Sequence, residues 1–564
     1  MAKKIIIVGG VAGGAGTAAR LRRLDEEAEI ILFERGEFIS FANCGLPYYI
    51  SGVISERDNL LVQTVEAMHQ RFNIDIRVKS EVTRILRDKK EVEVTSQGRI
   101  YRENYDYLVL SPGAEPLVPP IPGVDKQNIF TLRNMADVDR IKSMVTAKKP
   151  ERVAVIGGGY VGIEVAENMH HLGAKVTVVE AAEQILGPLD IEMARVIEKA
   201  LMDKGVGIIL KDGVERVEGD KTLAVILKSG QKVEAEMILL AVGVRPETKL
   251  AREAGLELGE RGGIKVNEYL QTSDQFIFAL GDAVEVKDIV SGEMALIPLA
   301  GPANKQARIV ADNIAGKKAR FNGSQGTSII KVFDFTAAAT GNNEKMLKRM
   351  KIPYLKSYTH SPSHAAYYPK AIPMIVKIIF SPDSGKLLGA QIVGKEGVDK
   401  RIDVLGTAIR MGLTVYDLEE LELAYAPPYS SAKDPVNMAG FTAANILKGE
   451  MKVIHWEQLD ALDKDRYILL DVRTDEEYQK GHVDGSMHIP VDSLRQRLNE
   501  LPGDKLIVVY CKIGLRGYIA YRILVQKGFD AVNLSGGFDI YQAMRYKYGQ
   551  SVNMNEQMTK KEKR

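Results

Sequence analysis

The sequence predicts an α/β protein of several domains, and three observations carry that prediction. Near the N-terminus, a strand runs through a glycine-rich turn into a helix and a second strand, over residues 5–34. The same pattern recurs about 150 residues later, over residues 153–180. A further α/β pattern of about 100 residues follows position 446. With 564 residues, the chain is long enough for three or four domains that each have a core.

The first glycine-rich turn has the features of a dinucleotide-binding fingerprint. A strand over residues 5–8 leads into Gly9-Gly10-Val11-Ala12-Gly13-Gly14, a helix is expected over residues 15–24, and the next strand ends in Glu34. The glycines let the backbone approach a pyrophosphate at the helix N-terminus, and the acid binds ribose hydroxyls. Val11 replaces the middle glycine of the usual pattern. The alternative, a turn of this type without a ligand, is disfavoured by the strand, helix and acid together.

The second turn, Gly157-Gly158-Gly159-Tyr160-Val161-Gly162, is a complete G-x-G-x-x-G, and its second strand ends in Glu180. Two such folds in one chain imply two nucleotides that meet. Glu180 would accept a hydrogen bond from a free 2′-hydroxyl and repel a 2′-phosphate, and Ala181 and Ala182 offer no arginine. The sequence therefore favours NADH over NADPH.

Three further strand ends belong to the same pattern. Residues 106–110 form a strand that stops at Ser111-Pro112-Gly113, and residues 238–245 close the second nucleotide fold. A strand over residues 276–280 ends at Gly281-Asp282. We expect the Asp282 carboxylate to accept a hydrogen bond from a ribityl hydroxyl of a flavin. The N-terminus of the next helix would point at the phosphates.

Cys44, within the stretch SFANCGLPYY, is the only cysteine in the first 510 residues. Because a thiol reacts as its thiolate, the question is whether the surroundings make and hold the anion. The acid-ended strand before Cys44 and the Gly-Leu-Pro turn after it favour a reactive cysteine over a buried apolar one. With Cys511 as the only other cysteine, a disulfide framework is excluded, and the distance between the two cysteines in the sequence disfavours a zinc site.

The composition excludes several other classes of protein. Lys and Arg number 76 against 74 for Asp and Glu, so the formal charge of +2 gives no global attraction to nucleic acid or membrane. No signal-peptide pattern and no apolar run of membrane-spanning length is present. We expect a cytoplasmic protein with no nucleic-acid or membrane partner.

With these motifs, residues 1 to about 445 resemble the flavoprotein disulfide reductases that have two dinucleotide folds, and among them the coenzyme A disulfide reductases. The resemblance implies FAD at the first fold, NADH at the second, and a homodimer formed through a C-terminal α+β domain. Many members of the larger family have a second cysteine five residues on, where this chain has Tyr49. A single cysteine can form a mixed disulfide with a substrate thiol or be oxidised to a sulfenic acid.

The resemblance also implies site residues. The FAD contacts are Gly9, Gly10, Ala12, Gly13, Gly14, Glu34, Arg35, Ser111, Pro112, Gly113, Gly281 and Asp282. The NADH contacts are Gly157, Gly159, Tyr160, Val161, Gly162, Glu180 and Gly243. The contacts for coenzyme A as substrate or bound thiol are Arg20, Arg23, Ser40, Asn43, Asn304 and Lys433, although a solvated helix face would also account for the arginines.

Two tyrosines complete the set that the resemblance implies. Tyr367 and Tyr425 match the family's hydroxyls that reach the cysteine of the partner subunit and stabilise or protonate a leaving thiolate. The alternative is a pair of interface aromatics without a chemical role.

The last domain resembles a single-domain rhodanese. A buried strand over residues 506–510 leads into Cys511-Lys512-Ile513-Gly514-Leu515-Arg516 and a helix. Successive loop N–H groups and a helix N-terminus would form an anion cradle that lowers the Cys511 pKa and stabilises a persulfide. Arg516 would orient the loop or bind an anionic sulfur donor. An inactive domain is the alternative, which the presence of Cys511 disfavours.

The expected boundaries follow from these motifs and the resemblance. They are 1–150 with 245–325 for the FAD-binding domain, 151–244 for the NAD(P)H-binding domain, 326–445 for dimerisation, 446–455 for a linker, 456–550 for the rhodanese domain and 551–564 for a disordered tail.

The combination of a region similar to coenzyme A disulfide reductases with a rhodanese-like domain predicts an NADH-dependent reductase of coenzyme A persulfide, polysulfide and coenzyme A disulfide. The reductase would act through a Cys44–S–S–CoA mixed disulfide, and Cys511 would carry sulfane sulfur. Two alternatives stay open. One is an NADH oxidase or peroxidase that uses a Cys44 sulfenic acid, and the other is a non-catalytic sulfur carrier. No metal is expected at any site.

Overall fold

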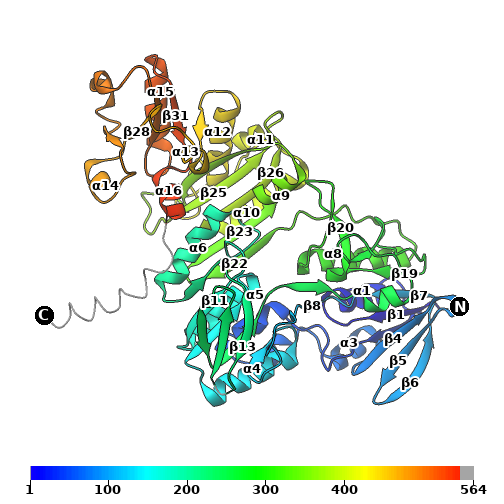
Figure 1. Cartoon of the computed structure of the whole chain (residues 1–564). Coiled ribbons are helices and arrows are strands. Elements are labelled where there is room, and N and C mark those ends of the chain that lie inside the picture. Colours follow the sequence, from blue (N-terminus) through cyan, green and yellow to red (C-terminus); the bar gives the residue numbers. More distant parts are fainter. Residues whose placement is uncertain (1, 221, 546–564) are drawn as a thin grey trace. The chain divides into compact units, whose positions relative to one another are not determined.

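The computed structural model describes residues 2–220 and 222–545, so the expected tail at 551–564 lies outside the described residues. The chain forms two compact units. The first comprises Met1–Ile185 and Val206–Gly326, and the second comprises Leu186–Gly205 and Thr327–Arg564. Figure 1 labels many of the helices and strands of both units.

The first nucleotide fold is a five-stranded parallel sheet in the order β19-β7-β1-β2-β3. Ile5 and Ile7 pack into one core and Ile6 into another, so both faces of β1 are covered, as the uninterrupted apolar run requires. The strands are β1 (Lys4–Val8), β2 (Glu29–Phe33), β3 (Asp75–Arg77), β7 (Tyr107–Leu110) and β19 (Ile277–Ala279). The associated helices are α1 (Ala12–Arg22), α3 (Val65–Phe72) and α8 (Ala300–Ile314).

The second nucleotide fold repeats this design in the order β12-β11-β10-β16-β9, again parallel. Its strands are β9 (Ile129–Phe130), β10 (Arg152–Ile156), β11 (Lys175–Val179), β12 (Gly207–Ile209) and β16 (Met237–Leu240), with α4 (Met135–Lys148) and α5 (Tyr160–His171). The two predicted dinucleotide folds are therefore confirmed.

Smaller elements complete the first unit. One small antiparallel sheet consists of β4 (Ser80–Leu86), β5 (Glu91–Ser96) and β6 (Arg99–Asn104). A second consists of β13 (Val214–Glu218), β14 (Leu223–Leu227) and β15 (Lys232–Ala235). The others are β8 (Ala114–Pro116), β17 (Val244–Pro246), β18 (Ile264–Lys265), β20 (Val284–Lys287), β21 (Met294–Ala295), η2 (Arg57–Leu60), η3 (Arg87–Lys89) and α7 (Lys249–Glu253). Cys44 lies in η1 (Asn43–Gly45), directly before α2 (Leu46–Ser51).

The second unit contains two sheets. One is antiparallel in the order β22-β23-β26-β25-β24. Its strands are β22 (Ser328–Val332), β23 (Phe335–Gly341), β24 (Leu355–Pro362), β25 (Pro373–Phe380) and β26 (Leu387–Gly394). The helices are α6 (Ile191–Asp203), α9 (Glu344–Met350), α10 (Val398–Met411), α11 (Val415–Glu420) and α12 (Pro435–Leu447). Strands and helices in this arrangement confirm the predicted α+β domain.

The other sheet is parallel, in the order β27-β31-β30-β28-β29. Its strands are β27 (Val453–Ile454), β28 (Tyr467–Asp471), β29 (Met487–His488), β30 (Leu506–Tyr510) and β31 (Ala531–Leu534). The helices are α13 (Trp456–Leu459), α14 (Asp475–Gln479), α15 (Leu515–Gln526) and α16 (Gly537–Arg545), with the short turns η5 (Leu494–Gln496) and η6 (Leu498–Glu500). β27 pairs with β31, so this sheet begins inside the segment expected as a linker.

Two local expectations differ from the structure. The first helix begins at Ala12 rather than at residue 15, because Gly13 and Gly14 of the turn already adopt helical backbone. The helix expected directly after Asp282 is a single 3-10 turn, η4 (Gly281–Ala283), followed by β20. The long helix α8 comes later and contacts η4.

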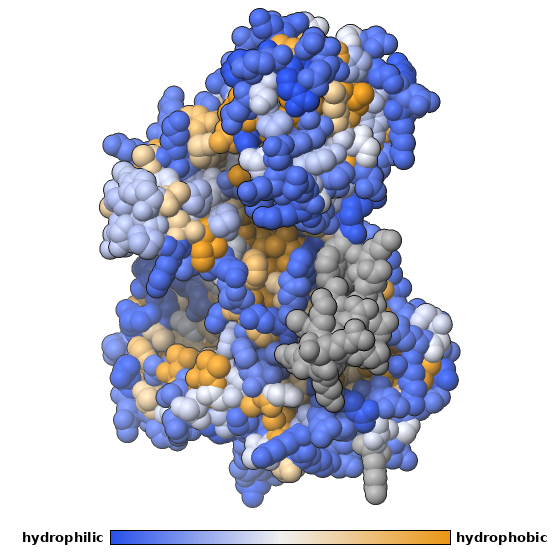
Figure 2. All heavy atoms as spheres, turned by 90° about the vertical axis from the view of Figure 1, so that its left-hand side faces the viewer, coloured by the Kyte–Doolittle hydropathy of each residue, from blue (hydrophilic) through white to orange (hydrophobic). Residues whose placement is uncertain are grey.

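Among the described residues, no helix is both long and apolar enough to cross a bilayer. The face in Figure 2 is mostly hydrophilic, with apolar patches scattered between polar side chains.

Candidate functional site

The first glycine turn is held by the acid at the end of β2. Glu34 accepts from the backbone N–H of Gly10 at 2.8 Å through Oε2 and from that of Gly36 at 2.7 Å through Oε1. Gly9 has φ +97°, and a Cβ there would lie 2.2 Å from the carbonyl oxygen of Ser111. The turn therefore requires glycine at this position, and the carboxylate fixes its shape.

The second turn repeats these contacts. Glu180 accepts from Gly158 N at 2.7 Å and from Ala182 N at 2.8 Å. Gly157 has φ +110°, and its Cβ would lie 2.2 Å from the carbonyl oxygen of Ala241. The two acids predicted to bind ribose thus also brace the turns that would hold the pyrophosphates.

The other predicted cofactor residues lie at the strand ends of the same folds. The backbone N–H of Ser111 bonds Val8 O at 2.8 Å, and Gly113 and Gly243 both have positive φ. Asp282 is partly buried, and burial raises its pKa although Arg133 opposes the shift. Ala12, Gly13 and Gly14 open α1, and Gly159, Tyr160, Val161 and Gly162 span the start of α5.

Sequence reasoning missed a charged group beside these residues. Glu247 receives two bonds from Arg35, at 2.6 and 2.9 Å, and one from Arg133 at 2.8 Å. Arg133 also donates to Pro112 O at 3.3 Å. Arg35, predicted as a cofactor contact, is therefore paired with a carboxylate 212 residues away in the sequence. No local pattern would have indicated this pairing.

The segment before Cys44 is tied to the first glycine turn. Ser40 N donates to Gly10 O at 2.9 Å, and Val62 N returns a bond to Ser40 O at 2.9 Å. Ser40 has φ +44°, a left-handed conformation that a non-glycine residue rarely adopts and that clusters at functional sites. Asn43 and Cys44 follow and are exposed.

The surroundings of Cys44 correct one expectation from the sequence. Partial burial of the thiol raises its pKa most, and the negative charges of Glu164 and Asp282 raise it further. The protein side chains around Cys44 therefore oppose the thiolate instead of holding it.

Glu164 is a second residue that sequence reasoning missed. It lies on α5 of the second nucleotide fold and accepts from the Tyr48 hydroxyl of α2 at 3.4 Å. Burial and the nearby Glu167 raise its pKa to about 7, against the effect of the Tyr48 hydrogen bond. The same neighbourhood raises the pKa of Tyr48 to about 12, first by burial and then by Glu164. The carboxyl thus titrates near neutral pH close to Cys44.

The arginines predicted to contact coenzyme A have partners of their own. Arg20 donates to Asp312 Oδ1 at 3.1 Å through Nε and 2.8 Å through Nη2. Arg23 lies over the Phe72 ring, with the guanidinium carbon 6.0 Å from the centroid. Asn304 is exposed on α8 and donates to Ala300 O at 2.9 Å.

In the second unit, the two predicted tyrosines meet. The hydroxyls of Tyr367 and Tyr425 are 2.6 Å apart, and the side chains are 75% and 47% exposed. Buried Arg401 holds the two segments together through Ser363 O at 3.0 Å, Tyr429 O at 3.4 Å and the carboxylate of Asp434. Lys433, the remaining predicted coenzyme A contact, is exposed.

Cys511 lies at the end of β30 with 0% of its side chain exposed. Its Sγ accepts from the backbone N–H of Gly514 at 3.0 Å, where φ of +122° turns the loop into α15. The N-terminus of α16 packs on the same loop, because Phe538 N donates to Cys511 O at 2.8 Å. The structure confirms the predicted strand, loop and helix around this sulfur.

The comparisons with known proteins agree with this geometry. A family model described as pyridine nucleotide-disulphide oxidoreductase matches residues 3–307, and the dimerisation-domain model of that family matches residues 327–435. The chain belongs to this family. A rhodanese-like domain model matches residues 456–544.

Three relatives of this oxidoreductase define the similarity more closely. The coenzyme A disulfide reductase of Staphylococcus epidermidis is 36% identical over 448 residues, covering 78% of this chain and 99% of that protein. The crystal structure of reduced Bacillus anthracis CoADR-RHD has 52% identity and a TM-score of 0.95, covering 96% and 98% of the two chains. An NAD-dependent persulfide reductase from A. fulgidus has 39% identity and a TM-score of 0.91, covering 95% and 100%. The predicted resemblance is confirmed.

Members of this oxidoreductase family use FAD and NAD(H), and the residues present fit two dinucleotides. Among the described residues, no side chain caps α1 or α5, and neither first turn contains an acid. By contrast, Thr64, Asn134 and Asn343 cap α3, α4 and α9. The uncapped N-termini therefore leave N–H donors and a positive helix end for a phosphate.

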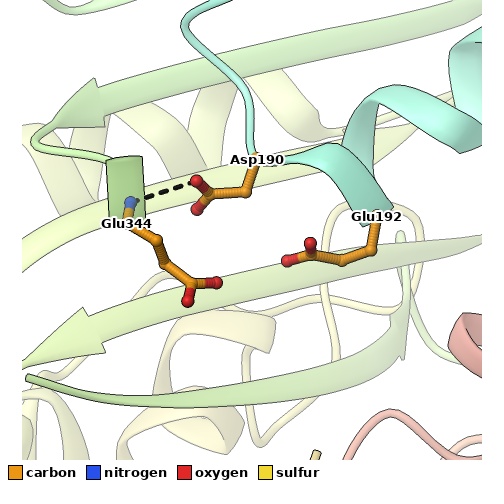
Figure 3. A group of neighbouring side chains, drawn as sticks. All are labelled: Asp190, Glu192 and Glu344. Carbon is orange, nitrogen blue, oxygen red and sulfur yellow. Dashed lines mark hydrogen bonds between the residues drawn. The ribbon is translucent and has the colours of Figure 1, made fainter. Parts of the chain in front are cut away.

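Three buried carboxylates of the oxidoreductase's second unit resemble a metal-ligand set. Asp190 and Glu192 come from the start of α6 and Glu344 from α9, and Figure 3 shows their side chains converging. Lys377 Nζ of β25 lies 2.7 Å from Asp190 Oδ2 and 2.5 Å from Glu344 Oε1, and it also bonds Glu192. The ammonium group therefore supplies the positive charge that a metal would bring.

A second lysine connects this cluster to the rhodanese-like domain. Lys356 on β24 donates to Glu344 at 2.9 Å and to Glu457 of α13 at 2.6 Å. Glu192 also accepts from the Tyr358 hydroxyl at 2.7 Å. The cluster thus fixes α13 against the sheet of the dimerisation domain.

Proposed function

We propose that the protein is an NADH-dependent flavoprotein reductase of coenzyme A persulfide, polysulfide and coenzyme A disulfide, with a rhodanese domain that carries sulfane sulfur. The observation that supports it most is the position of Cys44, a single exposed cysteine tied by Ser40 to a dinucleotide turn, in a chain whose other cysteine lies in an anion cradle. Relatives named as coenzyme A disulfide reductase and persulfide reductase support the substrate class.

The proposed sites follow the predicted residues. FAD would bind at the turn of Gly9 and Glu34 and NADH at that of Gly157 and Glu180, where a carboxylate disfavours the 2′-phosphate of NADPH. We place the domain boundaries as the sequence indicates. The homodimer would form through the dimerisation domain, and the protein would work in the cytoplasm without nucleic-acid or membrane partners.

In the proposed cycle, the Cys44 thiolate attacks the coenzyme A sulfur of CoA–S–SH. The S–S bond of the persulfide breaks, hydrosulfide leaves, and Cys44–S–S–CoA forms. FAD held at the turn of Gly9 and Glu34 would supply the two-electron transfer from NADH that reduces this mixed disulfide. The bond then breaks to return the Cys44 thiolate and coenzyme A thiol, so each turnover consumes NADH, one proton and the persulfide, and yields NAD⁺, coenzyme A and hydrogen sulfide.

Other residues would stabilise charge during these steps. The paired hydroxyls of Tyr367 and Tyr425 in one protomer would donate to the leaving thiolate at Cys44 in the other, which their exposure permits. Arg20, Arg23, Ser40, Asn43, Asn304 and Lys433 would contact coenzyme A. Arg20 would keep Asp312 as its partner, so its guanidinium offers the remaining N–H donors.

The test combines intact mass with anaerobic turnover. The non-reduced protein should have a coenzyme A adduct on Cys44, and NADH oxidation under argon should release sulfide faster from coenzyme A persulfide than it turns over coenzyme A disulfide. Cys44→Ser should abolish both activities, and Cys511→Ser should retain them. NADH consumption only with oxygen or peroxide would instead identify an oxidase or peroxidase, and negligible turnover with every substrate would identify a sulfur carrier.

A further inference from the structure

The arginine of the Cys511 loop is already paired. Arg516 donates to Glu477 of α14 in a fork, Nη1 to Oε2 at 2.6 Å and Nη2 to Oε1 at 2.8 Å. The hydrogen bonds from Arg516 lower the pKa of Glu477 to about 2, although partial burial opposes the shift. Glu477 and, to a smaller degree, the nearby Cys511 sulfur raise the pKa of Arg516. Both partners are therefore charged at neutral pH, so the ion pair as a whole has no net formal charge, although the guanidinium also acts directly on the Cys511 sulfur.

A second arginine at this loop is also paired. Arg473 is buried and donates to Asp471 through Nε at 2.9 Å and Nη2 at 2.6 Å, with its guanidinium 4.2 Å from the Phe538 ring centroid. Lys512 is exposed, and its charge acts on Asp539 of α16. Arg516 and Arg473 are each paired with a carboxylate, so these two arginines add no net formal charge at the loop.

Beside the loop, α15 presents apolar side chains to solvent. Leu515, the first residue of α15, is 60% exposed, and Ile519 is 41% exposed. These residues are four apart, so they share one face of the helix. That face begins directly after Gly514, whose N–H bonds the Cys511 sulfur.

We propose that Glu477 determines which sulfur donor Cys511 accepts: by pairing with Arg516 it disfavours small sulfur dianions such as thiosulfate, and the donor is a persulfide on a flexible arm that lies along Leu515 and Ile519. The pantetheine arm of coenzyme A has this chemistry. The inference rests on the proposed sulfur-carrying role of the rhodanese domain and deepens it, because it names the donor class and the residue that selects it.

The chemistry is the same for both donor classes. The Cys511 thiolate attacks the outer sulfur of R–S–SH, the S–S bond breaks, Cys511–S–SH forms, and R–S⁻ leaves and takes a proton. With thiosulfate, Cys511 attacks the outer sulfur, and sulfite leaves with the electron pair of the broken bond. Neither transfer needs an external oxidant or reductant. The donors differ in charge, since thiosulfate brings two negative charges to a loop whose two arginines are already paired.

The experiment measures sulfur loading of Cys511 in the full-length holoprotein with Cys44→Ser as background. Thiosulfate and coenzyme A persulfide are supplied separately, and the sulfur added to the Cys511 peptide is followed by mass spectrometry. In the background protein, persulfide should load at least tenfold faster than thiosulfate. E477Q should raise the thiosulfate rate about tenfold, which corresponds to about 1.4 kcal/mol, while the persulfide rate changes less than about twofold.

Three variants separate specificity from structure. E476Q removes one negative charge from the same helix at an exposed neighbour, and it should leave the donor ratio unchanged. Adding R516Q to E477Q should reverse the gain with thiosulfate, because the freed guanidinium is its source. Leu515→Ser with Ile519→Ser should slow loading from the persulfide several-fold and leave thiosulfate loading unchanged. Glutamine at position 477 can still accept from Thr474 of the helix cap, so α14 should keep its fold.

Three results would overturn the inference. Equal loading from both donors in the background protein, or an unchanged donor ratio in E477Q, would show that Glu477 does not select the donor, and the sulfur-carrying role would stand. If no donor loads Cys511 in any variant, the sulfur-carrying role itself fails, and with it the inference.

Discussion

Replacing Lys377 by methionine tests the buried charge cluster of the second unit. The substitution removes the ammonium group that Asp190, Glu192 and Glu344 share, and it keeps an apolar chain of similar length in β25. In the native protein, burial raises the pKa of Glu344, but the charges of Lys377 and Lys356 outweigh it and hold the pKa well below its usual range. Removing one partner of a buried pair leaves the other charge uncompensated.

The cost has an upper limit that depends on pH. An orphaned glutamate can take up a proton, and from an unfolded pKa of about 4.3 this costs about 3.7 kcal/mol at pH 7 and about 1.6 kcal/mol at pH 5.5. Glu344 keeps Lys356 and Glu192 keeps Tyr358, so we expect one proton to suffice. K377M should therefore lose about 4 kcal/mol of stability at pH 7 and about half of that at pH 5.5.

The direction in which stability changes with pH follows from the link between proton binding and folding. In the native protein the depressed pKa of Glu344 gives stability that is complete above its unfolded value and constant between pH 5.5 and 7. In K377M a carboxyl of the cluster has a pKa above its unfolded value, so stability falls as pH rises through the same window. Hydrogen-exchange mass spectrometry of the β25 peptide, residues 373–380, measures this locally and does not require two-state unfolding.

The matched control is K348M. Lys348 also lies beside Glu344, with Nζ at 3.7 Å from Oε2, but 65% of its side chain is exposed. An exposed pair contributes about 0 to 1 kcal/mol, so K348M should change the exchange of β25 little at either pH. A loss below about 1 kcal/mol in K377M, or an equal loss at pH 5.5 and 7, would refute the reasoning from uncompensated charge.

Three further predictions concern the sites. Glu164→Gln should lower the pKa of Cys44 and speed its alkylation by iodoacetamide, most strongly above pH 7, where the native carboxyl is ionised. Cys511 in the same sample is the internal reference. An unchanged dependence of the Cys44 alkylation rate on pH would contradict the effect. Glu180→Gln should weaken NADH binding about tenfold, by about 1.4 kcal/mol, and reduce the preference over NADPH in equilibrium titrations. Glu457→Gln should speed hydrogen exchange in α13 by loosening its bond to Lys356, and unchanged exchange would show that other contacts hold the helix.

The fold and the turns of the candidate site could be predicted because their signals are local. A glycine that must adopt φ near +100° and an acid at the end of the next strand lie within about 25 residues of each other, so Gly9 with Glu34 and Gly157 with Glu180 are visible in the sequence. The Cys511 loop is local in the same way. The start of the first helix at Ala12 differed because a glycine turn leaves the first helical residue undefined, and the helix expected after Asp282 and the linker that contains β27 differed as well.

The charges that tune the sites could not be predicted because tertiary contacts create them. Glu164 meets Tyr48 across 116 residues, and Arg35 meets Glu247 across 212. Lys377 reads in the sequence as one charge in an apolar strand, and only the fold brings three carboxylates to it. The expectation that the neighbours of Cys44 would favour its thiolate was wrong for the same reason, since its two acids come from distant segments.

The raised pKa of Cys44 has a consequence for a chain with one cysteine at this site. A resting thiolate is the form that peroxide oxidises, and without a neighbouring thiol the sulfenic acid could not be resolved as an internal disulfide. The negative charges of Glu164 and Asp282 favour the protonated thiol of Cys44 at rest. The thiolate would then form when a bound thiol substrate, or a tyrosine hydroxyl from a partner subunit, stabilises the negative charge. If this protection operates, Glu164→Gln should form the Cys44 sulfenic acid several-fold faster with hydrogen peroxide at pH 8, as followed by dimedone trapping and peptide mass. Equal rates in the variant and the native protein would show that access to the sulfur, and not its charge, limits oxidation.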